Sequence, residues 1–129
     1  MTLSIPPSHS PCSPSLAKGF VLAAPHSGSG KTTLSIGLMR ALKRRGFDIS
    51  PAKVGPDYID PQFHEVASGT PSFNLDGWAM GAETLNSLGS AMTRDNSLCV
   101  VEGVMGLFDG AVKPGVLGHG ATCEIAKFF

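Results

Sequence analysis

The sequence predicts an α/β domain in which crossover helices connect the strands of a parallel sheet. Short apolar runs of strand length alternate with segments of helical periodicity, in the order strand, loop, helix, strand, helix, strand. Most of the 16 glycines gather in three clusters, which indicates loops with a specific shape. Aromatic residues make up only 7% of the chain, which suits a layered α/β domain better than a small β-barrel.

The first strand, the first helix and the second strand follow one another along the chain. Residues 19–24, "GFVLAA", form an apolar run of strand length. Residues 32–45 carry apolar side chains on one helical face and basic side chains at the end, where cations suit the helix dipole, and Gly46 ends the helix. Residues 47–54 predict the second strand, in which Pro51 favours an irregular or edge position.

The rest of the chain predicts three helices and one more strand. Asp60 is a candidate cap for a short helix whose first position is Pro61. A helix is expected over residues 82–92 and a strand over 97–102. Residues 121–129 begin a further apolar helix. Because a sheet normally has more than three strands, we expect the chain to be the N-terminal part of a longer protein.

Composition excludes several classes of function. Ten basic residues balance ten acidic ones, so no net field draws the chain to nucleic acid or to a membrane surface. No apolar run approaches the length of a membrane span. Residues 1–18 are rich in Ser and Pro, which predicts a disordered arm rather than a signal peptide. The three cysteines, Cys12, Cys99 and Cys123, form no metal-spaced pair, so we expect a reducing, cytoplasmic location.

The segment "PHSGSGKTT", residues 25–33, predicts a phosphate-binding loop between the first strand and the first helix. Backbone N–H groups of such a loop surround phosphate oxygens, so glycine is needed where the backbone comes closest. Lys31 is placed to reach the terminal phosphates and the Thr32 hydroxyl to bind Mg²⁺. Pro25 replaces the opening glycine of the usual pattern. The predicted nucleotide-binding residues are Ser27, Gly28, Ser29, Gly30, Lys31, Thr32 and Thr33.

Four acidic residues are expected near this loop, at the carboxyl ends of the second and third strands. Asp57 and Asp60 follow the second strand, and Glu102 and Asp109 follow the third. Thr32, Asp57 and Glu102 are the predicted magnesium ligands. Asp60 and Asp109 each have an alternative structural interpretation, as a helix cap and as part of an Asp-Gly turn.

Other polar and aromatic residues are less informative. Lys53 either binds an anionic substrate or is a surface lysine at the end of a strand. His64 and His119 show no metal-like spacing. Phe73 and Trp78 flank "NLDGW", where they line a pocket or cover the core, and the core is favoured.

Four segments together resemble a known family. "PHSGSGKTT", "KVGPDYIDPQFH", "PSFNLDGW" and "VVEGVMGLFDG" are similar to the synthetase half of the cobyrinic acid a,c-diamide synthases, which in aerobic pathways act on hydrogenobyrinic acid. The resemblance extends from about Phe20 to the C-terminus. It implies a P-loop NTPase-type fold of the dethiobiotin-synthetase kind, of which residues 19–129 form only the N-terminal part.

The resemblance also implies an activity. The family uses ATP and Mg²⁺ to amidate the a and c carboxylates of a corrinoid through an acyl phosphate. Lys31, Asp57, Asp60, Glu102 and Asp109 match its functional positions. Ammonia would come from glutamine, released by a C-terminal glutaminase domain that nothing in this sequence matches. We therefore expect this fragment alone to be inactive; whether it forms a homodimer is left open.

Three alternatives are weighed against this interpretation. A dethiobiotin-synthetase-like ligase shares the fold, but the "GPDYIDP" loop argues against it. A partitioning-type ATPase switch would place a signature lysine early in the phosphate loop, where this chain has His26. The third is an inactive remnant that binds ATP weakly or not at all.

Overall fold

The computed structural model describes residues 18–129. In chain order its elements are β1 (Gly19–Leu22), α1 (Lys31–Arg44), β2 (Ile49–Val54), α2 (Asp60–Ser68), β3 (Phe73–Leu75), α3 (Ala82–Met92), the short 3-10 helix η1 (Arg94–Asn96), β4 (Leu98–Glu102) and α4 (Thr122–Phe128). The arm predicted for residues 1–18 lies outside the described residues except for Lys18. The carbonyl of Lys18 accepts a hydrogen bond from the Cys99 N–H at 3.0 Å.

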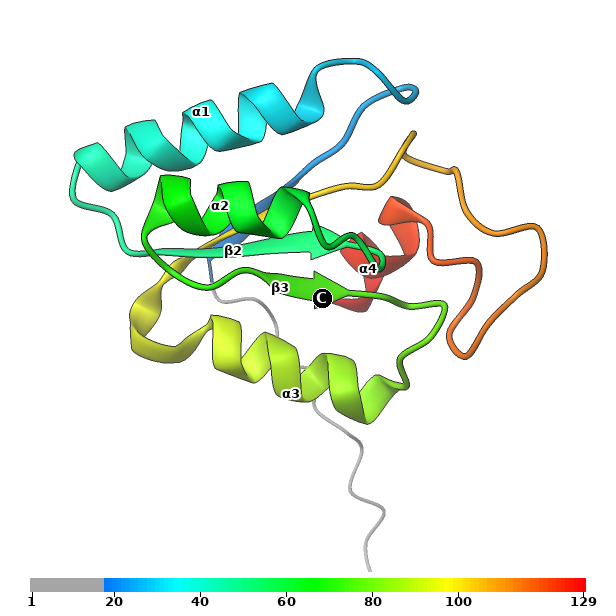
Figure 1. Cartoon of the computed structure of the whole chain (residues 1–129). Helices are drawn as coiled ribbons and strands as arrows, with labels where there is room; N and C mark the ends of the chain where they lie inside the picture. The colour runs from blue at the N-terminus through cyan, green and yellow to red at the C-terminus, as the bar shows by residue number, and fades with distance from the viewer. Residues whose placement is uncertain (1–17) are drawn as a thin grey trace, which may run out of the picture.

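The strands form one parallel sheet in the order β1-β4-β2-β3, which confirms the predicted α/β class. Helix α1 connects β1 to β2 and α2 connects β2 to β3, so both crossovers run in the direction from β1 toward β3. Helix α3 connects β3 to β4 and runs in the opposite direction. Because crossovers between parallel strands are right-handed, this reversal puts α3 on the other face from α1 and α2. Figure 1 shows α1 and α2 on one side of the sheet and α3 on the other.

Strand alternation divides the core between the two faces. On β4, Val101 packs in the cluster that contains Leu85 of α3. Its neighbour Val100 packs in the cluster that contains Met39 of α1. Glu102 has the same parity as Val100, so its side chain extends from the α1 and α2 face at the end of the strand.

The strand β3 corrects the prediction of a three-stranded sheet. It has only three residues, too few for a recognisable alternation, and it pairs with Ala52–Val54 of β2. Pro51 was expected to give β2 an irregular or edge position, but β2 as a whole lies between β4 and β3. Pro51 pairs with Val100 on the β4 side, while β3 begins one residue later along β2. A proline is tolerated there because the strand has only one neighbour at that point.

The start of α2 also differs from the prediction. Asp60 was a candidate cap for this helix, but it is the first helical residue, and Ile59 is the N-cap. The Asp57 Oδ1 just before the helix accepts the N–H of Ile59 at 2.8 Å and of Asp60 at 3.1 Å. The Asp60 carboxylate instead contacts side chains of β2 and α1, as described below. No helix within residues 18–129 is long and apolar enough to cross a membrane.

Candidate functional site

The loop between β1 and α1 prepares the N-terminus of α1 to receive an anion. Gly28 has φ 77° and Gly30 has φ 81°, in the left-handed region that favours glycine. Gly30 is the N-cap residue and makes no side-chain cap. The first N–H groups of this 14-residue helix therefore have no side-chain acceptor, and the helix dipole adds positive potential there.

Hydrogen bonds within the loop fix its shape. The Ser29 hydroxyl donates to the His26 carbonyl at 2.8 Å, and the His26 ring nitrogen Nδ1 lies 2.8 Å from the Ser27 carbonyl. A carbonyl can only accept, so Nδ1 carries the proton in this contact. His26, exposed to solvent, thus stabilises the loop conformation.

The first two residues of α1 direct their side chains toward the end of β4. Lys31 is largely buried, and its Nζ donates a hydrogen bond to the Met105 carbonyl. The Thr32 Oγ1 lies 2.6 Å from Glu102 Oε1 and 3.2 Å from Asp60 Oδ2. Because a hydroxyl has one proton, the shorter contact assigns it to Glu102 and leaves the lone pairs of Thr32 for another partner.

The sheet register brings a lysine beside this glutamate. Lys53 of β2 pairs with Glu102 of β4 across the ladder, and both side chains extend from the same face. The Lys53 Nζ donates to Glu102 Oε1 at 2.9 Å and to Asp60 Oδ2 at 2.6 Å. Burial lowers the pKa of Lys53, but its hydrogen bonds with Asp60 and Glu102 outweigh burial and raise the pKa above its ordinary value.

Glu102 is the centre of this network and is fully buried. Besides the contacts to Oε1, its Oε2 accepts a hydrogen bond from Ser35 of α1 and lies 2.7 Å from His64 Nε2 of α2. Burial alone would raise the pKa of Glu102, yet the four side-chain donors hold it far below its ordinary value. The carboxylate is therefore ionised with about four lone-pair positions filled.

Residues 55–60, which connect β2 to the first residue of α2 and which we call the acidic loop, supply two carboxylates with free oxygen atoms. The Asp57 Oδ1 accepts backbone N–H groups, while its Oδ2 lies 3.8 Å from Lys53 Nζ. Burial opposes ionisation of Asp57, but these N–H groups and Lys53 keep its pKa below the ordinary value. The hydrogen bonds that reach Asp60 from the described residues go to Oδ2. Asp57 Oδ2 and Asp60 Oδ1 therefore remain available to a ligand.

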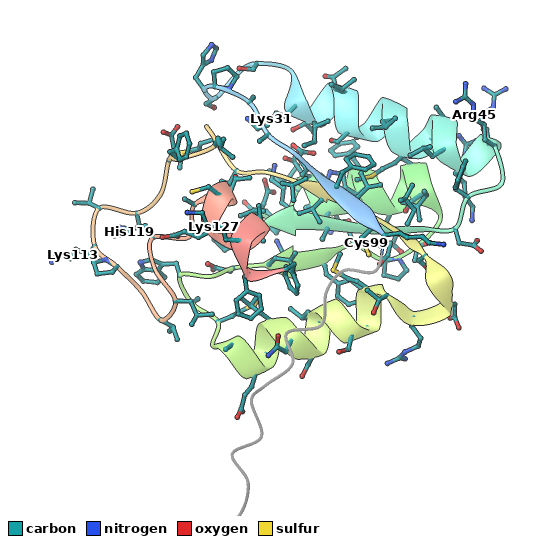
Figure 2. The ribbon with its side chains drawn as sticks, turned by 180° about the vertical axis from the view of Figure 1, so that it is seen from behind. Lys31, Arg45, Cys99, Lys113, His119 and Lys127 are labelled. Carbon is teal, nitrogen blue, oxygen red and sulfur yellow. The ribbon has the colours of Figure 1, made fainter. Side chains whose placement is uncertain are left out.

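These groups line one pocket of about 440 Å³ at the carboxyl end of the sheet. Figure 2 places Lys31 at this end of α1 and Arg45 beyond the other end. The lining comprises Ser27, Gly28, Gly30, Lys31, Thr32, Thr33, Lys53, Asp57, Asp60, Glu102, Val104 and Met105. We call this the phosphate pocket, because it joins an uncapped helix N-terminus to two lysines.

The residues of the phosphate pocket fit a magnesium ion that is held mainly by phosphate and water. Among residues 18–129, no group of three or more His, Cys, Asp and Glu side chains is arranged to hold a metal. Mg²⁺ often takes only one or two carboxylates from the protein. Thr32 Oγ1, Asp57 Oδ2 and Asp60 Oδ1 can serve, whereas Glu102 is already saturated by protein donors. Glu102 thus orients Thr32 in this structure, and its predicted role as a magnesium ligand stays a prediction.

Comparison with known proteins places this fold and pocket in a family. Residues 20–109 match the model of the CobQ/CobB/MinD/ParA nucleotide binding domain. The chain belongs to this family. The match covers the phosphate loop, the acidic loop and β4, so the nucleotide-binding character of the domain is established at the level of the family.

The chain is similar to several curated members of this nucleotide-binding family. It is 57% identical over 113 residues to the hydrogenobyrinate a,c-diamide synthase of Rhodobacter capsulatus, covering 87% of this chain and 26% of that protein. It is 55% identical to the synthases of the same name from Brucella anthropi and Rhizobium meliloti, covering 85% and 84% of this chain and 24% of each relative. The chain thus spans about a quarter of the length of these relatives.

Two predicted residues of this family domain do not line the phosphate pocket. Ser29 contacts His26 within the loop instead. Asp109 lies in a turn, where its Oδ2 accepts the Gly106 N–H at 2.9 Å, and it borders a separate pocket with Pro25. The structure therefore brings together Lys31, Asp57, Asp60 and Glu102 but not Asp109, whose backbone and carboxylate both hydrogen-bond to Gly106 and close the turn of residues 106–109.

Sequence reasoning missed three residues that support the site. Ser35 lies one helical turn after Lys31, and His64 one turn after Asp60, so helical spacing points both pairs in one direction. Asn74 of β3 donates to the carbonyls of Gly55 and Asp57 at 2.8 and 2.6 Å. The helical spacing was a usable signal for Ser35 and His64. None was available for Asn74, because β3 itself was not predicted.

Proposed function

We propose that this chain is the nucleotide-binding part of a hydrogenobyrinate a,c-diamide synthase. In this role it binds ATP with Mg²⁺ and transfers the terminal phosphoryl group to a carboxylate of the corrinoid. The observation that carries the proposal is the phosphate pocket, in which an uncapped helix N-terminus, two lysines and two partly free carboxylates converge. The names of its relatives support the choice of acceptor.

The residues of the pocket divide the work of phosphoryl transfer. The N–H groups at the start of α1 bind phosphate oxygens, and Lys31 draws charge from the terminal phosphate as the bond to it breaks. Lys53 is assigned to the acceptor carboxylate, because it lines the same pocket as Lys31 and its ion pairs keep it charged. Mg²⁺, bound through Thr32 and the acidic loop, would neutralise phosphate charge.

The acceptor carboxylate attacks the terminal phosphorus of ATP, which gives an acyl phosphate and ADP. Ammonia released from glutamine then attacks the acyl carbon, and phosphate leaves to yield the amide. Lys31 and Lys53, both largely buried, stabilise the charge on the phosphoryl group during its transfer in the first step and on the departing phosphate in the second. The glutaminase that supplies the ammonia is part of the proposal and is not among the residues described.

Binding of Mg²⁺ and ATP to this chain is the first test. Titration calorimetry should detect binding that requires both. Lys31→Met keeps the length of the side chain but removes the charge, so its affinity should fall by about tenfold or more, as expected for loss of a charge-assisted hydrogen bond. Lys43→Met, near the far end of the same helix, is the matched control and should bind as the unmodified chain does.

Chemical trapping tests the acyl phosphate directly. Hydroxylamine reacts with an acyl phosphate to give a hydroxamate, so ammonia and a glutaminase are not needed. Incubation with ATP, Mg²⁺, hydrogenobyrinic acid and hydroxylamine should yield a hydroxamate of the acid and ADP, and Lys31→Met should abolish both. Absence of ATP binding by the unmodified chain would contradict the proposal and favour an inactive remnant.

A further inference from the structure

A second pocket adjoins the phosphate pocket and differs from it in character. It has a volume of about 270 Å³ and lies between the end of β3 and the loop that follows β4. Val104 and Met105 line both pockets, so they form a common wall. The acidic loop is shared too, because Pro56 lines the second pocket and Asp57 the first. We call this second space the wall pocket.

The wall pocket is mainly apolar and is held in shape by hydrogen bonds. Trp78 is half exposed, yet its indole Nε1 donates to the Lys113 carbonyl at 3.0 Å. The Trp78 carbonyl accepts the Val116 N–H at 2.8 Å, so the loop after β4 is tied to the segment after β3 at both points. His119 Nδ1 lies 2.7 Å from the Ala111 carbonyl. Figure 2 shows Lys113 and His119 on this loop, at the same end of the molecule as Lys31.

One buried carboxylate in the wall pocket has a free oxygen. Asp76 is only 5% exposed and belongs to the pocket lining. The hydrogen bonds that reach it from residues 18–129 come from the N–H groups of Trp78 and Ala79, at 2.9 and 3.3 Å, and both go to Oδ1. Its Oδ2 is therefore available to an N–H or O–H donor in the pocket. An apolar pocket with a few oriented polar groups is typical of a small-molecule site.

Exposed apolar side chains lie on the segments that line the wall pocket. Met105 and Trp78 are each nearly half exposed, and Val112 and Val116 on the same loop are more exposed still. Exposed apolar side chains that gather on one part of a surface are typical of binding sites. A ligand that uses both the pocket and these side chains is larger than the pocket and largely apolar.

We propose that the wall pocket binds the apolar body of the carboxylic acid that is phosphorylated, with one of its carboxylates reaching past Val104 and Met105 into the phosphate pocket. This inference rests on the proposed function and adds the location of the acceptor. The wall that the two pockets share supports this location of the acceptor. Because Lys31 Nζ contacts the carbonyl of Met105, a carboxylate that extends past Met105 from the wall pocket arrives beside Lys31 in the phosphate pocket. Asp76 Oδ2 accepts a hydrogen bond from a donor on the acceptor.

The experiment uses two variants with matched controls and two ligands. Ala111→Leu fills part of the wall pocket and keeps the backbone contacts of Ala111. Asp76→Asn retains an acceptor for the backbone N–H groups and turns the free oxygen into a donor. The controls are the same exchanges at exposed sites, Ala41→Leu and Asp48→Asn. Hydrogenobyrinic acid is the acceptor probe, and ATP with Mg²⁺ is the second ligand, measured separately by calorimetry.

Binding of the acceptor is followed by equilibrium dialysis and by fluorescence of Trp78, the single tryptophan of the chain. We expect both pocket variants to bind the acceptor about tenfold more weakly, as overpacking and a reversed hydrogen bond each predict. Their affinity for ATP and Mg²⁺ should be unchanged, which also shows that they fold. Both controls should bind both ligands as the unmodified chain does.

The outcomes separate this inference from the proposed function. If the unmodified chain binds ATP but not the acceptor, or if both pocket variants bind the acceptor normally, the assignment of the wall pocket is overturned and the nucleotide site stands. If the unmodified chain binds no ATP, the proposed function itself fails. Loss of acceptor binding in the pocket variants alone supports the assignment.

Discussion

At the scale of single residues, His64 shows how a side chain without metal-like spacing can shape a site. It is fully buried, with Nε2 2.7 Å from Glu102 Oε2 and Nδ1 3.3 Å from the Ser72 hydroxyl. An ionised carboxylate only accepts, so Nε2 carries a proton, while Nδ1 shares a hydrogen bond with the Ser72 hydroxyl. His64 thereby orients Glu102, and Glu102 orients Thr32 in the phosphate pocket.

Two substitutions of His64 separate this positioning role from simple packing. The amide nitrogen of His64→Gln reaches about as far as Nε2, whereas that of His64→Asn reaches only as far as Nδ1. We expect calorimetry to show affinity for ATP with Mg²⁺ within about threefold of normal for the glutamine variant and about tenfold weaker for the asparagine variant. Equal affinity in both variants, at comparable thermal stability, would rule out positioning through Nε2.

At the scale of elements, the short strand β3 holds the acidic loop in place. Asn74 of β3 is the ladder partner of Lys53, and its amide donates to the carbonyls of Gly55 and Asp57. These two bonds join the loop before α2 to the edge of the sheet. The loop's carboxylates are therefore held by β3 as well as by the start of α2.

Asn74→Asp tests this connection with almost no change in side-chain shape. The carboxylate cannot donate, so both bonds are lost and two carbonyls face a negative charge. Backbone amides of residues 55–60 should exchange with solvent faster, while those of α3 serve as an internal reference and should not change. Affinity for ATP with Mg²⁺ should fall by about tenfold, measured by calorimetry. Unchanged exchange over residues 55–60 would show that β3 does not hold the loop.

The sequence predicts the longer elements well because periodicity accumulates over their length. Residues 82–92 were predicted as a helix and form α3, and the strand expected over 97–102 appears as β4. The strand β3 has only three residues, too few for its periodicity to be recognised. The pairing of Lys53 with Glu102 depends on the order of the strands in the sheet, and the alternation of residues within one strand does not specify that order. Sequence motifs therefore predicted the phosphate loop and the acidic residues, but they did not predict which side chains these residues contact.

At the scale of the whole molecule, the buried charges of the phosphate pocket couple folding to pH. Glu102 has a pKa below its ordinary value of 4.5, so it stabilises the fold above that pH, and the contribution is lost as the pH falls below it. Lys53 has a pKa above its ordinary value of 10.5, so its contribution is complete below that pH and is lost only as the pH rises beyond it. Between these limits both contributions are present.

Glu102→Gln tests the acid limb of this dependence. In the variant, Lys53 loses one ion-pair partner, and the side chains that donate to Glu102 meet an amide in place of a carboxylate. Its free energy of unfolding near pH 7 should therefore be lower by about 3 kcal/mol. The unmodified chain should lose stability progressively as the pH falls from about 4.5 toward the much lower pKa that Glu102 has in the folded chain. The variant should lose less, because the titrating group is gone. Urea denaturation across this range measures both, with Asp48→Asn as the exposed control. Parallel acid limbs in the variant and the unmodified chain would show that Glu102 does not dominate the pH dependence of folding.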